Sequence, residues 1–211
     1  MSHIILPEPI EGNGFNSKAI IPFGVTTAHI RAAMQDFIDF ATAVDTELHA
    51  KGMASLENTM MQANFSSLVG EMMVARIPKH CPTVVKNLYH NGHPDILPAG
   101  KYRNNKAQHA SRGIEIKASR YLHGWQGHNA EDVWLLVFVF QSGRAGPKVE
   151  KPQAFKFLLV AGAMLAKADW KFSGRSVTSR RTITASVSKA GAGKMMANWI
   201  YKCAELRQGK G

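Results

Sequence analysis

Residues 133–140 read Val133-Trp134-Leu135-Leu136-Val137-Phe138-Val139-Phe140, one of the two longest apolar runs in the chain. A run of this length suits a strand and is far too short to cross a membrane. Because both alternating faces are apolar, the run is typical of a central strand that is covered on both sides. It therefore predicts an α/β fold in which helices flank a sheet.

Patterns on either side of this run predict the other elements. We expect further strands at about residues 83–89, 95–97, 114–119, 155–160 and 181–187. Helices are expected at about residues 26–50, 55–77 and 192–206, with Thr26 or Thr27 capping the first and Pro78 stopping the second. Residues 169–180 are polar, and we expect them to be irregular.

These elements fit a single domain. A chain of 211 residues with 45% hydrophobic content can bury one core without stabilising crosslinks. Residues 1–24 are rich in Pro and Gly and predict an extended N-terminal arm, whereas residues 25–211 form the α/β domain. The first helix is expected to pack on the body of the protein or on a second subunit, and in a dimer the arm and the first helix are the expected interface.

The net charge of +11 is unevenly distributed along the chain. Residues 1–50 hold 2 basic and 6 acidic residues, whereas residues 151–211 hold 12 basic residues against only Asp169 and Glu205. This excess in the C-terminal third indicates a polyanionic partner such as nucleic acid. An ordinary basic surface is the alternative interpretation.

Cysteine content and hydropathy indicate the cellular compartment of the protein. Cys81 and Cys203 lie far apart, and the first residues lack the basic and apolar regions of a secretory signal. No apolar run approaches the length of a membrane span. We therefore expect a cytoplasmic protein with no membrane partner.

Two carboxylates and a lysine occur in an order that suits phosphodiester hydrolysis. The turn Gly92-His93-Pro94-Asp95 enters one expected strand, and Gly113-Ile114-Glu115-Ile116-Lys117 enters another. Because side chains alternate along a strand, Glu115 and Lys117 point the same way, with Ile116 buried behind them. If Asp95 lies on the neighbouring strand, its carboxylate meets that of Glu115, and oxygen ligands of this kind suit Mg²⁺.

An exposed Glu/Lys strand and a turn aspartate are the alternative interpretation of this pattern. The intervening residues 96–114 favour the catalytic interpretation, because they contain no acid and their basic side chains would help a phosphate to approach a metal ion. Their basic side chains are Lys101, Arg103, Lys106 and Arg112.

With Glu71 in the preceding helix, the order Pro94-Asp95 and Glu115-Ile116-Lys117 resembles the PD-(D/E)xK nuclease superfamily, specifically its type II restriction endonucleases. The resemblance implies an α/β, restriction-endonuclease-like mixed sheet flanked by helices. It also implies that Asp95, Glu115 and the carbonyl of Ile116 hold Mg²⁺, for which Mn²⁺ can substitute. Lys117 would orient or deprotonate the attacking water.

Two further implications of the resemblance concern Glu71 and the assembly. Glu71 would join the catalytic group, although a solvated helix end is nearly as good an interpretation. The substrate would be double-stranded DNA, and a homodimer would supply the two sites that cutting both strands requires. The chain departs from the common pattern in the 19 residues between Asp95 and Glu115, which leaves the topology of the sheet open.

Basic, polar and aromatic side chains near these motifs are expected to contact DNA. The stretch 119–129 leaves the catalytic strand with the composition of a loop that meets a groove or backbone, and arginines can read guanine edges. A solvated surface is the alternative for each of them. The predicted DNA-binding residues are Arg103, Lys106, Arg112, Ser119, Arg120, Trp125, Gln126, His128, Arg175, Ser179, Arg180 and Arg181.

Other motifs do not support a different chemistry. Gly191-Ala192-Gly193-Lys194-Met195 mimics a phosphate-binding loop but lacks its first glycine and its Ser/Thr, so we expect no nucleotide cofactor. The histidines and cysteines show no zinc spacing, and His90 and His93 are interpreted as local to the turn.

Two alternatives to a restriction-type enzyme stay open. A junction resolvase or a nicking repair enzyme would use the same catalytic residues. A non-catalytic nucleic-acid-binding protein would instead use the basic C-terminal third, and its acidic pair would be structural.

Overall fold

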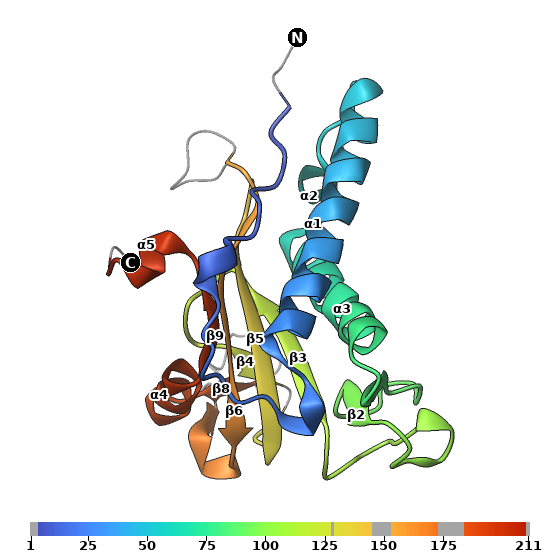
Figure 1. Cartoon of the computed structure of the whole chain (residues 1–211), viewed down its shortest axis with the longest axis vertical. Helices are drawn as coiled ribbons and strands as arrows, with labels where there is room; N and C mark the ends of the chain where they lie inside the picture. The colour runs from blue at the N-terminus through green and yellow to red at the C-terminus, as the bar shows by residue number, and fades with distance from the viewer. Residues whose placement is uncertain (1–3, 128, 145–152, 173–183, 210–211) are drawn as a thin grey trace, which may run out of the picture.

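The computed structural model describes residues 4–127, 129–144, 153–172 and 184–209, which form a mixed α/β fold (Figure 1). A six-stranded sheet with the order β1-β2-β3-β5-β6-β9 lies at its centre. The parallel pair is β3 with β5, and the other neighbours are antiparallel, so the sheet is mixed, as predicted. Its strands are β1 (Val84–Lys86), β2 (Ile96–Pro98), β3 (Ile114–Ser119), β5 (Val133–Gln141), β6 (Lys156–Leu165) and β9 (Trp199–Lys202).

Strand β5 is the covered central strand that its sequence predicts. Leu136 and Phe138 belong to a core on the helical side of the sheet. Leu135 and Val137 alternate with them and belong to a second core on the opposite side. Both faces of β5 are therefore buried, which explains why its sequence is continuously apolar.

Two long helices, α1 (Thr27–Ala50) and α3 (Gln62–His80), cover one face of the sheet (Figure 1). Helix α1 begins where predicted, because the Thr26 hydroxyl accepts from the His29 N–H and the His29 ring accepts from the Thr26 N–H. Phe37 on α1 is fully buried, and its ring centroid lies 5.1 Å from that of Phe155. This aromatic packing fixes the helices to the sheet.

The single helix expected at residues 55–77 is wrong in two respects. The structure has a short α2 (Leu56–Thr59), then an extended pair, Met60 and Met61, and then α3. The break follows from tertiary contacts, since Asp45 accepts from the Leu56 N–H (2.7 Å) and Arg144 donates to the Met60 carbonyl (3.2 Å). Pro78 lies inside the last turn of α3, where its missing N–H removes only one helical hydrogen bond.

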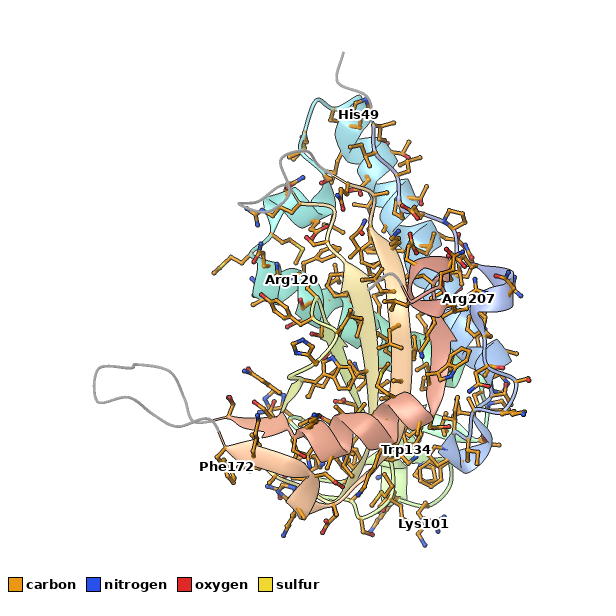
Figure 2. All side chains as sticks on the ribbon, turned by 90° about the vertical axis from the view of Figure 1, so that its left-hand side faces the viewer. His49, Lys101, Arg120, Trp134, Phe172 and Arg207 are labelled. Atoms are coloured by element: carbon orange, nitrogen blue, oxygen red, sulfur yellow. The ribbon has the colours of Figure 1, made fainter. Side chains whose placement is uncertain are left out.

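The opposite face of the sheet is covered by α4 (Lys189–Ala197) and a small second sheet (Figures 1 and 2). This sheet has the order β4-β8-β7. Buried Trp125 and Met195 fill the space between the layers. The strands are β4 (Gln126–Gly127), β7 (Trp170–Phe172) and β8 (Ala185–Val187), of which β7 lies in the stretch that was expected to be irregular.

The helix expected at residues 192–206 is also wrong. After α4 the chain forms the edge strand β9 and then a short helix, α5 (Ala204–Arg207). Strand β9 forms because β6 offers it an antiparallel partner on one side, and the Asn16 N–H donates to the Ile200 carbonyl (3.0 Å) on the other. Pairing with distant segments thus overrides the helical pattern.

Residues 4–24 follow the sheet edge as the predicted arm, with two short turns, η1 (Gly12–Gly14) and η2 (Pro22–Gly24). Phe15 packs on Tyr201 with 4.9 Å between ring centroids, and Arg207 lies 2.5 Å from Glu11. The apolar stripe of α1 is buried in the core of the same chain. That stripe is therefore not available as the dimer surface proposed for the first helix.

The ion pair between α1 and α3 predicts a pH-dependent contribution to stability. Asp36 lies 2.6 Å from both Arg76 and His80. Burial opposes the charged form of Asp36, but its contacts with Arg76 and His80 outweigh burial and lower its pKa below the ordinary 3.8. Asp36→Asn should therefore reduce the free energy of unfolding by about 1 kcal/mol near neutral pH.

This loss should disappear in acid, because a group whose pKa is lowered in the folded state stops contributing once the pH falls through that pKa. Urea titrations of wild type and Asp36→Asn at pH 7 and near pH 2, below the lowered pKa, measure the difference. Asp39→Asn, on the same helix and hydrogen-bonded only to Gln35 in the described structure, is the control. A destabilisation of Asp36→Asn that stays constant between the two pH values would contradict the assignment.

Candidate active site

Strands β2 and β3 part immediately after they meet. Ile96 pairs with Ile114, and this is the one residue pair between the two strands. Beyond it, the Ile116 N–H donates to Oδ2 of Asp95 (2.8 Å) in place of a strand partner. Because the N–H and C=O of one extended residue point to the same side, the Ile116 carbonyl also faces this open edge.

Asp95 is held in place by the turn that precedes it. The His93–Pro94 peptide bond is cis. The buried Asn87 side chain donates to the Pro94 carbonyl (3.0 Å), and the Asn87 N–H donates to the Asp95 carbonyl (2.8 Å). Asn87, the residue directly after β1, therefore fixes the backbone at Asp95.

Glu115 and Lys117 share one side of β3, as their spacing predicts. Ile114 and Ile116 alternate with them along the strand and pack in the core that α1 and α3 cover. The Lys117 ammonium lies 2.5 Å from Oε1 of Glu115, whose side chain is buried with only 9% of the residue exposed. The structure thus brings Asp95, Glu115 and Lys117 together at the open edge of β3.

A histidine and a second glutamate, which the sequence motifs do not predict, complete this cluster. Nδ1 of His93 lies 2.9 Å from Oε2 of Glu115, and Nε2 lies 2.6 Å from Oε2 of Glu131. The His93 ring therefore bridges two carboxylates. The position of His93 directly before Pro94-Asp95 is a sequence signal for a role in the site, although the sequence alone favours a local turn residue.

The electrostatics of the cluster follow from burial and close charges. Burial, and then the neighbouring carboxylate of Glu115, raise the pKa of Asp95 well above its ordinary value. Burial opposes the charge of Glu115, but contacts with His93 and Lys117 outweigh it and lower the pKa of Glu115. Burial likewise opposes the charge of Lys117, and the adjacent Glu115 outweighs it and raises the lysine pKa.

Two hollows open onto the cluster. The larger has a volume of about 720 Å³ and is lined by the site residues together with the loop that follows β1. The smaller, of about 200 Å³, lies between β3 and α3. Both are lined by Glu71, Val74, Asp95 and Lys117, so α3 forms one wall of the site.

Glu71 lies in this wall but does not contact the other acids through any described hydrogen bond. Its side chain is 67% exposed, and its Oε2 lies 3.2 Å from the ammonium of Lys86. The DNA hydrolysis that the sequence resemblance implies should stay within about threefold of wild type in Glu71→Gln, because an exposed ion pair contributes little. Single-turnover rates on plasmid DNA measure this, and a hundredfold loss would instead place Glu71 in the catalytic group.

Apart from Trp125, the predicted DNA-binding residues divide into three groups. Arg103, Lys106 and Arg112 are exposed on the connection between β2 and β3, although Arg112 also stacks on Phe23 at 5.5 Å. Ser119 and Arg120 are half-buried at the end of β3, and Gln126 is exposed on β4. The others, His128, Arg175, Ser179, Arg180 and Arg181, lie outside the described residues.

The predicted DNA contact of Trp125 is not supported. Only 2% of Trp125 is exposed, and its indole N–H donates to the Tyr121 carbonyl (2.9 Å). The ring packs in the second core, where it stabilises the small sheet. Similarly, Lys194 of the segment that mimics a phosphate loop lies 2.7 Å from Asp169.

The donor groups at the open edge fit a hard divalent cation. Oε2 of Glu115 is buried and lies 2.9 Å from Nδ1 of His93, and it accepts no hydrogen bond within the described structure. No three His, Cys, Asp or Glu side chains among the described residues are placed to hold a metal ion by themselves. Two carboxylates and a carbonyl, completed by water and phosphate, would make the incomplete protein shell that Mg²⁺ usually has.

The comparisons with known proteins give no further information about this site. Within the described residues, no helix has both the length and the apolar character needed to span a membrane. No protein-family model matches the chain, and neither a curated protein nor a solved structure matches it.

Proposed function

We propose that this protein is a Mg²⁺-dependent endonuclease that hydrolyses phosphodiester bonds of DNA, with a restriction-endonuclease-like fold. The observation that carries the proposal is the meeting of Asp95, Glu115 and Lys117 at the unpaired edge of β3. Asp95 lies directly before β2, whereas Glu115 and Lys117 lie on β3, and 19 residues separate Asp95 from Glu115 in the sequence. A merely solvated Glu/Lys strand would give no reason for Asp95 to bind the backbone of Ile116.

The arrangement of elements supports the proposed fold. The acid and the lysine lie on β3, which is central, parallel to β5 and covered by the long helices α1 and α3. Helix α3 precedes the site in sequence and forms its wall. This order corresponds to the restriction-endonuclease-like arrangement that the sequence resemblance implies.

Each residue has a definite role in the proposed reaction. Asp95, Glu115 and the Ile116 carbonyl would hold the metal ion, which when bound would polarise the scissile phosphate and activate a water molecule. Lys117 supplies a fixed positive charge that offsets negative charge on the phosphate and orients the attacking water. His93 acts as a positioning residue, because it contacts Oε2 of Glu115 while Lys117 contacts Oε1.

Digestion of a supercoiled plasmid tests the proposal. The full-length protein should convert the plasmid to nicked, linear or fragmented DNA with Mg²⁺ or Mn²⁺, and EDTA should prevent this. Discrete fragments would indicate a restriction-type enzyme, whereas nicks alone would indicate a repair or junction enzyme. Binding without any metal-dependent cleavage would contradict the proposal and favour a non-catalytic nucleic-acid-binding protein that uses the basic C-terminal third.

A further inference from the structure

The loop between β1 and the Asp95 turn presents two large apolar side chains to solvent. Leu88 is 56% exposed and Tyr89 is 42% exposed. Both belong to the lining of the 720 Å³ hollow that also contains Asp95, Glu115 and Lys117. We refer to Leu88 and Tyr89 together as the apolar rim.

The backbone of the apolar rim is held rigidly despite this exposure. Oδ1 of Asn87 accepts from the Tyr89 N–H (3.0 Å) and from the Ala107 N–H (3.1 Å). The Leu88 N–H donates to the Asn105 carbonyl (2.9 Å), and the Gly92 N–H donates to the Tyr89 carbonyl (2.9 Å). The loop is thus fixed to the basic connection between β2 and β3.

The same anchor holds the apolar rim in a constant position relative to the catalytic acid. The Asn87 N–H donates to the Asp95 carbonyl, and the Asn87 amide donates to the Pro94 carbonyl. A DNA strand whose phosphate lies at the site would pass Leu88 and Tyr89, because these residues line one hollow with Asp95 and Glu115. An exposed aromatic side chain on a fixed backbone is a surface on which a base can stack.

We propose that the apolar rim binds an unpaired nucleobase next to the scissile phosphate. This proposal rests on the proposed nuclease function and names its substrate class. Bases within a regular duplex have both faces covered by their neighbours, so a ring beside the backbone can stack only on a base that has left the helix. The preferred substrate is then DNA with a locally unpaired base at the cleavage point, such as a mismatch, a bulge or a branch.

Binding measurements in EDTA test the rim separately from the chemistry. Fluorescence anisotropy compares a labelled DNA duplex with the same duplex that contains a central two-nucleotide bulge. We expect wild type to prefer the bulged duplex, and Tyr89→Ala to lose about ten- to a hundredfold of its affinity for the bulged duplex alone. Tyr89→Phe, which keeps the ring, should restore the affinity, and Phe172→Ala should behave as wild type because Phe172 is exposed outside the hollow.

The outcomes separate this proposal from the nuclease function. If Tyr89→Ala and Leu88→Ala bind both DNAs as wild type does, or if wild type shows no preference for the bulge, the apolar rim is not a base-binding surface. That result would leave plasmid cleavage with Mg²⁺ unaffected. If Tyr89→Ala loses the preference but no DNA is cleaved with Mg²⁺, the rim is supported and the hydrolytic function fails.

Discussion

Replacing Lys117 with alanine is expected to reduce Mg²⁺-dependent DNA cleavage by about a thousandfold or more. Lys117 is the cation adjacent to Glu115, with 2.5 Å between its ammonium and Oε1. Its removal takes away the fixed charge that would stabilise the phosphate and orient the nucleophile. Because Lys117 is one cation in a strongly basic chain, DNA affinity should change by less than about threefold.

The matched control is Lys18→Ala, which removes an exposed lysine from the N-terminal arm, outside both hollows. Single-turnover cleavage and equilibrium binding should be measured on the same preparations, with circular dichroism to verify folding. Lys18→Ala should cleave as wild type does. If Lys117→Ala also cleaves at the wild-type rate, Lys117 has no catalytic role.

Replacing Asp95 with asparagine should have an equally large effect, again a loss of about a thousandfold in cleavage. Asparagine has nearly the same shape, and its amide oxygen can still accept from the Ile116 N–H, so the strand edge should be preserved. The substitution removes one of the two negative charges that would hold the metal ion. Raising the Mg²⁺ concentration should therefore restore part of the activity.

Asp39→Asn provides the comparison for Asp95→Asn. Asp39 is exposed on α1, accepts a hydrogen bond from Gln35, and lines neither hollow. Cleavage rates measured over a range of Mg²⁺ concentrations separate weakened metal binding from slower chemistry. An Asp95→Asn protein with the metal dependence and rate of wild type would remove Asp95 from the site.

The sequence predicts the elements whose patterns are local. Strand β3 has the expected bounds, β5 extends by one residue, and α1 begins at the expected cap. Asp95 also lies beside β3 as expected, because Ile96 pairs with Ile114 and the Asp95 carboxylate accepts from the Ile116 N–H. The bounds of these elements follow from side-chain alternation or capping within a few residues, whereas the position of Asp95 depends on pairing between β2 and β3.

The elements that the sequence does not predict depend on distant partners. Strand β9 replaces a helix because β6 and the N-terminal arm pair with it from both sides. The bridge from His93 to Glu131 exists because parallel pairing places the start of β5 beside the start of β3. The burial of Trp125 likewise depends on α4 and the small sheet, which local composition does not reveal.

Diffraction from crystals of wild-type protein grown with Mn²⁺ would test whether Asp95 and Glu115 hold one metal ion together. We expect an anomalous peak at the open edge of β3, about 2.1 Å from a carboxylate oxygen of Asp95, one of Glu115 and the carbonyl of Ile116. Lys117 would remain beside the ion without binding it. A Mn²⁺ ion bound elsewhere, with Asp95 and Glu115 turned away from a common point, would contradict the account.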